Sequence, residues 1–132
     1  MNIIVKHQAP SAQDYCDLRK VAGLSPMPLK AAKVAVDGAL YAVTFYDGER
    51  LIAMGRVIGD GACFFQIIDI AVHPDCQGQG LGKQVMEHIE AYLQSVTQPG
   101  SYVSLIGDKP QFYEKLGYQY TAPNGHGMFK KF

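Results

Sequence analysis

The chain has 132 residues, with 12 Lys and Arg against 12 Asp and Glu, so its formal net charge at pH 7 is zero. Neither half carries an excess of either sign, which excludes a protein that binds nucleic acid through bulk positive charge. The length and a hydrophobic content of 48% predict one globular domain over residues 1–132.

The first half of the chain has the pattern of a strand and two helices followed by an antiparallel meander. The Ser11 hydroxyl can cap a helix whose first turn carries Asp14, and Gly23 is suited to end that helix. The pair Asp47-Gly48 is typical of a hairpin turn between two strands. The expected elements are strand 2–7, helix 11–22, helix 29–36 and strands 40–46, 51–58 and 62–72.

The second half alternates helix and strand. Apolar residues recur at every third or fourth position from Leu81 to Val96, which predicts one amphipathic helix over that range. Two strands joined through a helix pair in parallel by a right-handed crossover. A short helix is expected to begin at Asp108, which has capping-box spacing to Gln111. The other expected elements are strands 102–106, 118–121 and 128–132, which complete a mixed α/β sheet, antiparallel first and parallel in its centre, with about four helices.

The cysteines and the N-terminal segment indicate the compartment. Cys16, Cys63 and Cys76 are an odd number, without a Cys-x-x-Cys pair or a histidine at zinc spacing, so we expect free thiols and no metal. The apolar run at the N-terminus is too short for a signal peptide or a membrane span. We therefore expect a cytoplasmic protein that does not contact a membrane.

A glycine-rich loop at 77–82, QGQGLG, lies between the strand at 62–72 and the amphipathic helix. Glycines let backbone N–H groups approach a ligand, and the helix N-terminus adds the positive end of its dipole, so this loop suits an anionic group. Its spacing fits neither the dinucleotide fingerprint Gly-x-Gly-x-x-Gly nor a Walker loop. It fits the pattern Gln/Arg-x-x-Gly-x-Gly/Ala, which is filled here by Gln77, Gly80 and Gly82.

With this loop directly after the strand sequence IIDIAVHP, the chain resembles the GCN5-related N-acetyltransferase (GNAT) superfamily. The segment FYEKLGY at 112–118 is similar to that family's second signature, and the order of elements resembles its whole fold. The resemblance covers nearly the full chain and is most specific over 67–118. It implies an acyltransferase (EC 2.3.1.-) with acetyl-CoA as cosubstrate, held where the parallel central strands splay apart.

The resemblance also implies how acetyl-CoA is held. Main-chain groups of the strand would pair with the pantetheine arm, and the Val72 N–H would donate to the thioester carbonyl and stabilise the oxyanion. The loop N–H groups would bind the pyrophosphate, while Lys83, Lys109 and Lys115 are either phosphate contacts or solvated helix charges. The expected cofactor-binding residues are Ile70, Ala71, Val72, Gln77, Gly78, Gln79, Gly80, Leu81, Gly82, Lys83 and Tyr113.

Two side chains are catalytic candidates for proton transfer. Tyr113 matches the family's tyrosine that protonates the departing thiolate. Direct transfer also needs a neutral amine, and an alkylamine with a pKa near 10.4 is mostly protonated at pH 7, a deficit of roughly 4–5 kcal/mol. Asp69 is the only carboxylate of the long strand, so it is the candidate base, unless it caps a backbone N–H or pairs with Arg56. In sugar-phosphate members of the family this strand often reads Ile-Glu-Asp, and Ile68 stands here at the Glu position.

The acceptor is expected to be a primary amine of a small molecule, which receives the acetyl group directly in a ternary complex. The expected acceptor site is aromatic and has no acidic cluster; its candidate residues are Tyr15, Met27, Pro28, Tyr41, Phe45, Phe64, Phe65 and His126. A protein N-terminus or lysine as acceptor and a non-catalytic CoA-binding regulatory module are the alternatives. The zero net charge disfavours an aminoacyl-tRNA, and the sheet edges with a β-rich C-terminus are compatible with a homodimer.

Overall fold

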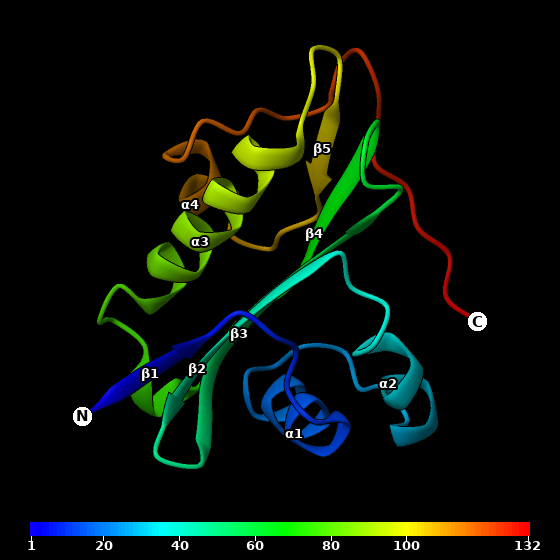
Figure 1. The fold of residues 1–132 in the computed structure, drawn as a ribbon. Helices are drawn as coiled ribbons and strands as arrows, with labels where there is room; N and C mark the ends of the chain where they lie inside the picture. Colours follow the sequence, from blue (N-terminus) through cyan, green and yellow to red (C-terminus); the bar gives the residue numbers. More distant parts are fainter.

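The computed structural model describes residues 1–132 as a five-stranded sheet with helices on both faces (Figure 1). α1 and α2 lie on one face, and α3 and α4 lie on the other. The elements are β1 (Ile3–Lys6), α1 (Ala12–Val21), α2 (Leu29–Ala35), β2 (Tyr41–Asp47), β3 (Arg50–Gly59), β4 (Phe64–Val72), the 3-10 turn η1 (Pro74–Cys76), α3 (Leu81–Val96), β5 (Tyr102–Leu105) and α4 (Pro110–Glu114). None of these helices has the length and apolar character needed to cross a bilayer.

The strand order is β1-β2-β3-β4-β5, so each strand pairs with its neighbours in the sequence. The first four strands are antiparallel, and β4 pairs with β5 in parallel. α3 makes the crossover between these two strands, because a parallel pair cannot be joined by a tight turn. The predicted fold class, a mixed sheet with an antiparallel first part and a parallel centre, is confirmed.

A bulge in β4 separates it from β5. Ala71 pairs with Met54 and Ile68 with Arg56, so β4 carries one residue more than β3 across this interval. Asp69, inside the bulge, has φ +60°, which is uncommon for a residue other than glycine and marks a local kink. The parallel pairing ends before it, at Ile67 opposite Leu105. Beyond that point the two strands splay apart.

The main core lies between the sheet and α3. The inner side of the helix is fully buried at Val85 and Ile89, as its apolar period predicts. At Gly55, opposite the bulge, an added Cβ would lie 2.7 Å from side-chain atoms of Ile70 and Val85. The helix therefore packs directly on the backbone of β3, next to the place where β4 bends.

Three predictions near the C-terminus are wrong. The strands expected at 118–121 and 128–132 do not form, because a strand needs a ladder partner and neither segment has one here. Asp108 does not begin a helix: α4 starts at Pro110, and its N-cap, Lys109, makes no side-chain cap. Proline suits the first helical position, where no N–H is required, and it moves the start two residues downstream.

Candidate cofactor and active site

A cleft of about 410 Å³ opens where β4 and β5 splay apart. One wall is the end of β4 with the glycine-rich loop and the first turn of α3, and the opposite wall is the start of α4. Of the predicted cofactor-binding residues, the cleft is lined by Ile70, Ala71, Val72, Gln77, Gly78, Gly80, Leu81, Gly82, Lys83 and Tyr113. Gln79 alone does not line it. Residues 43 positions apart in the sequence thus meet around one space.

Two glycines give the loop its course. Gly78 and Gly80 have φ values of +80° and +79°, a left-handed conformation that side-chain-bearing residues rarely adopt. Gly80 is the N-cap of α3, and it offers no side-chain group to the first helical N–H groups. Those N–H groups have no partner within the helix, and they carry the positive end of its dipole. The first turn of α3 can therefore bind an anion at the cleft.

The backbone of Val72 is directed away from β3. The His73 N–H donates to the Ile52 carbonyl at 2.7 Å, which makes Val72 and Ala53 a non-hydrogen-bonded pair of the antiparallel ladder. In such a pair the N–H and C=O groups point outward, here toward the splay. The Gln77 side-chain amide donates to the Val72 carbonyl at 3.1 Å, and the Val72 N–H is left for a ligand in the cleft.

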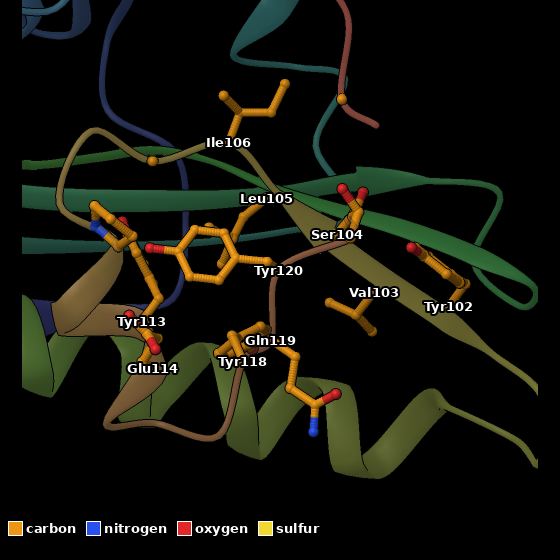
Figure 2. A pocket seen from close by; sticks show the side chains of 14 residues that line it. Tyr102, Val103, Ser104, Leu105, Ile106, Tyr113, Glu114, Tyr118, Gln119 and Tyr120 are labelled. Atoms are coloured by element: carbon orange, nitrogen blue, oxygen red, sulfur yellow. The ribbon is translucent and has the colours of Figure 1, made fainter. Parts of the chain in front are cut away.

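Tyr113 lies between the cofactor cleft and a second cavity that runs along β5 (Figure 2). Its ring fits against Gly107, where an added Cβ would lie 2.5 Å from the ring. The hydroxyl makes no hydrogen bond within the protein. Burial, and then the negative charge of Asp108, raise the pKa of Tyr113, so its phenol keeps the proton that a general acid needs.

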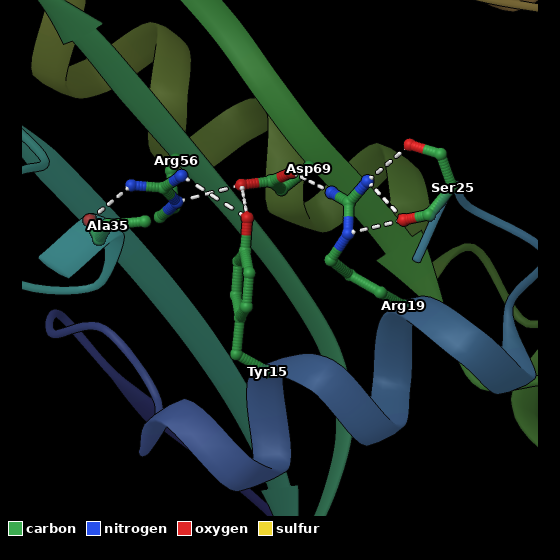
Figure 3. Close-up of polar contacts among 6 residues, drawn as sticks. All are labelled: Tyr15, Arg19, Ser25, Ala35, Arg56 and Asp69. Carbon is green, nitrogen blue, oxygen red and sulfur yellow. Dashed lines mark hydrogen bonds and ion pairs between the residues drawn. The ribbon is translucent and has the colours of Figure 1, made fainter. Parts of the chain in front are cut away.

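Asp69 is the centre of a buried polar network between α1 and the sheet (Figure 3). Its carboxylate accepts from the Tyr15 hydroxyl at 2.8 Å, from Arg56 Nε at 2.8 Å and from Arg19. Both guanidinium groups are bound further, to Ser25 and to the Ala35 carbonyl. The Asp69 side chain is only 6% exposed and does not line the cleft.

This arrangement matches the pairing with Arg56 that the sequence left open as an alternative to a base. A base must accept a proton, whereas both carboxylate oxygens of Asp69 are engaged by cations. Asp69 instead connects the bulge of β4 to α1 through Arg19 and Tyr15. The network fixes the strand segment whose backbone forms one wall of the cleft.

The structure divides the candidate phosphate-binding lysines and acceptor residues into those that line the cleft and those that do not. Lys83 and Lys109 line the cleft, while Lys115 does not. Phe45 and Phe65 are buried core residues, so they cannot contact an acceptor. The remaining expected acceptor residues do not gather around the cleft either.

The sequence predicts the α1–α2 loop at the acceptor site through Met27 and Pro28, whereas the residues of this loop that line the cleft are Ala22, Gly23 and Leu24. The only sequence signal for these three was the helix-ending glycine, which does not say what the loop will face. No group of three or more His, Cys, Asp or Glu residues is placed to hold a metal ion.

Comparison with known proteins is consistent with this geometry. Residues 37–120 match the family model described as an acetyltransferase (GNAT) domain. The uncharacterised N-acetyltransferase ycf52 of Gracilaria tenuistipitata is 36% identical in an alignment of 124 positions that covers 86% of this chain and 66% of that relative. The chain thus spans about two thirds of the relative's length.

Solved structures show the same fold. A probable acetyltransferase of unknown function from methicillin-resistant Staphylococcus aureus is 47% identical and superimposes with a TM-score of 0.95, over 99% of this chain and 100% of its own. A GNAT family acetyltransferase from Brucella melitensis, solved with acetyl-CoA, has a TM-score of 0.65 at 15% identity, over 89% of this chain and 83% of its own.

The chain therefore belongs to the GNAT acetyltransferase family, and the predicted family is confirmed. The predicted enzyme class, an acyltransferase of the N-acetyltransferase type, agrees with this membership and with the names of the relatives. Acetyl-CoA is bound by this fold in the Brucella protein.

Proposed function

We propose that this protein transfers the acetyl group of acetyl-CoA directly to a primary amine of a small molecule within a ternary complex. The observation that carries the proposal is the cleft at the splay. There a free backbone N–H at Val72, the uncapped first turn of α3 and the Tyr113 phenol face one space. In one extended acyl-CoA, the Val72 N–H would bind the thioester carbonyl and the first turn of α3 would bind the pyrophosphate. The Tyr113 phenol would face the sulfur.

In the proposed reaction the amine nitrogen attacks the thioester carbon, and the carbonyl oxygen becomes an oxyanion that accepts from the Val72 N–H. When the tetrahedral intermediate collapses, the C–S bond breaks and Tyr113 donates its proton to the thiolate of CoA. The ammonium formed on the acceptor gives its proton to water at the open side of the cleft. The Tyr113 phenolate then regains a proton from water, so the net products are the acetylated amine and CoA.

In this scheme Asp69 has a positioning role. Its two carboxylate oxygens are bound by Arg19 and Arg56, and its side chain does not line the cleft, so it does not face the acceptor amine. Deprotonation of the free amine in solution, which requires roughly 4–5 kcal/mol at pH 7, is compatible with moderate turnover. This scheme predicts that kcat/KM rises with pH toward the pKa of the acceptor amine.

A small acceptor fits the walls of the cleft. The α1–α2 loop contributes Gly23 and Leu24 to the walls of the cleft. A peptide acceptor needs an open groove on both sides of the reacting amine, and a loop in the wall reduces the space for such a groove. The cleft has no acidic cluster to attract a polyamine.

The test is acetyl-CoA turnover, followed as release of the free thiol of CoA, against aromatic monoamines, amino sugars, amino acids, polyamines and lysine peptides. We expect turnover with a monoamine in preference to polyamines and peptides. Turnover with peptides alone would favour the protein-acetyltransferase alternative. Micromolar CoA binding in calorimetry without turnover of any amine would favour the non-catalytic regulatory module.

A further inference from the structure

Arg19 connects two segments that line the cofactor cleft (Figure 3). Its guanidinium pairs with Asp69, which directly precedes Ile70 in the wall formed by β4. Arg19 Nε and Nη2 also donate to the Ser25 carbonyl at 2.9 and 2.7 Å, and Nη2 donates to the Ser25 hydroxyl at 3.0 Å. Ser25 directly follows Leu24, which lines the cleft from the α1–α2 loop. One side chain therefore binds both the loop and the strand.

This connection is buried and built on a rigid group. Arg19 is only 6% exposed. A guanidinium is planar and presents its N–H groups in fixed directions, so it can bind groups on two sides at once. Hydrogen bonds from a charged donor are also stronger than those between neutral groups. Arg19 therefore sets where Ser25 lies relative to Asp69.

The other hydrogen bonds of the loop do not reach the sheet. The Gly23 and Leu24 N–H groups donate to carbonyls in the last turn of α1, and the Met27 carbonyl accepts from a thiol of the same helix. Pro26 and Pro28 have no N–H group to donate. The hydrogen-bonded connection between this loop and β4 therefore runs through Arg19.

Arg56 provides an internal comparison. It is 5% exposed, it pairs with the same carboxylate, and it also donates to a further carbonyl, that of Ala35 at 2.7 Å. Ala35 is the last residue of α2 and does not line the cleft. The two arginines thus match in charge, burial and partner, and they differ in whether the further contact reaches a segment at the cleft.

We infer that Arg19 is a positioning residue for the acceptor, because it holds the α1–α2 loop at the distance from β4 that an acceptor amine requires. The hold on the loop follows from the contacts of Arg19 with Ser25 and Asp69. Its consequence for the acceptor rests on the proposed function.

The side chains that the loop and β4 bring to the cleft define the class of acceptor. They are all apolar: Ala22, Leu24, Ile70, Ala71 and Val72. Contact with apolar area is favourable in proportion to the area that is buried. The acceptor is therefore a primary amine on an apolar body, such as 2-phenylethylamine, and its contact area falls when the loop moves away from β4.

The first experiment measures hydrogen exchange of the Leu24 amide in Arg19→Lys and in Arg56→Lys. Lysine keeps a charge opposite Asp69, but its ammonium is a compact point charge and cannot bind on two sides as the planar guanidinium does. Both variants should lose a similar amount of stability, which unfolding in urea checks. We expect Leu24 to exchange about tenfold faster in Arg19→Lys than in Arg56→Lys. Equal rates would overturn the proposal.

Ser25→Ala is a milder variant at a half-exposed position, and it serves also if Arg19→Lys does not fold. It removes the hydroxyl that Arg19 binds and leaves both bonds to the carbonyl. The Leu24 amide should exchange about two- to threefold faster than in the wild type. An unchanged rate would likewise count as a refutation.

The second experiment follows steady-state acetyl transfer to 2-phenylethylamine, read as release of the free thiol of CoA. The KM for the amine should be about fivefold higher in Arg19→Lys than in Arg56→Lys, because only the former releases the loop. The kcat at saturating amine and the affinity for CoA should be similar in the two variants. An equal KM would assign Arg19 a purely structural role and overturn the proposal, and turnover only of amines without an apolar body would overturn the class of acceptor.

The two experiments separate this inference from the proposed function. If the wild type acetylates no amine, the proposed function fails, and the role of Arg19 in acceptor binding fails with it. The exchange rate of Leu24 needs no substrate, so it still decides whether Arg19 holds the loop.

Discussion

The cofactor cleft and the second cavity along β5 are both lined by Tyr113, and they differ in what holds their walls. The wall of the cleft is fixed by the buried network around Asp69 and by a continuous strand–loop–helix unit. The second cavity has one wall from β5 and another from a segment that belongs to no ladder. The first site is built by local sequence and buried contacts, whereas the second lies at the unpaired edge of the sheet. The predictions below test this contrast.

Asp69→Asn should have the largest effect, because it leaves Arg19 and Arg56 buried with no counter-charge. We expect a loss of about 3–5 kcal/mol in the free energy of unfolding, measured with urea. Asp75→Asn is the matched control, since its ion pair with Arg50 is 70% exposed on the Asp75 side and contributes at most about 1 kcal/mol.

The same variant tests the role of Asp69 in catalysis. Measured where it remains folded, Asp69→Asn should keep the acidic limb of its kcat/KM profile, because the acceptor amine sets that limb. A loss of the acidic limb would instead identify Asp69 as the base.

Tyr113→Phe should lower kcat by about 10²-fold or more, because the thiolate of CoA would leave without a proton. The affinity for CoA, measured by calorimetry, should change less than about twofold. The control is Tyr118→Phe, which removes a hydrogen bond to Glu90 and should lower stability more than kcat. A large loss of CoA affinity in Tyr113→Phe would show that the ring has only a structural role.

The dependence of kcat on pH should reflect the ionisation of the same Tyr113 phenol. Burial and Asp108 raise the pKa of Tyr113, so the phenol stays protonated at pH values at which a free tyrosine, with a pKa of about 10, ionises. Ionisation of Tyr113 should therefore cause no decline of kcat at pH values below about 10. Asp108→Asn removes the smaller cause and should move the alkaline decline to lower pH. A decline unaffected by Asp108→Asn would assign it to another group.

Gly80→Ala should weaken CoA binding by about tenfold, since a side chain at φ +79° strains the loop that presents the first turn of α3. Gly100→Ala is the control, because it creates the same kind of strain at φ +95° outside the cleft. Both variants should lose about 1 kcal/mol of stability. Equal loss of CoA affinity in the two would mean that the loop acts only through overall stability.

Salt should have the smallest effect. The chain has no excess positive charge, and only Lys83 and Lys109 line the cleft, so CoA recognition relies on backbone N–H groups. We expect the dissociation constant of CoA to rise less than about threefold between 50 and 200 mM NaCl. A steep dependence would show that lysine charges dominate.

The elements next to the cleft could be predicted because their signals are local. α3 spans the predicted residues 81–96, since one apolar stripe and two glycines define both its face and its start. The N-cap at Ser11 also forms as predicted, because a hydroxyl and an N–H three residues later need nothing else. By contrast, nothing local to residues 118–121 and 128–132 indicated a pairing partner, and neither predicted strand forms.

For the candidate site, residues within a recognisable motif were found and residues without one were missed. The loop residues 77–83, apart from Gln79, and Tyr113 carry such motifs, and they line the cleft. Gly23 and Leu24 come from a segment about 50 residues before the loop, and only packing brings them to the same cleft.

The sequence by itself determined the family and the anion-binding loop, because both depend on motifs of a few consecutive residues. Only the tertiary structure shows the ion pairs of Asp69 and the direction of the Val72 N–H. A carboxylate that looks free in the sequence is neutralised by arginines 13 and 50 residues away. The zero net charge is consistent with how the cleft binds an anion. Part of the positive charge is buried against Asp69, so the cleft recognises its anionic ligand mainly through glycine-exposed backbone.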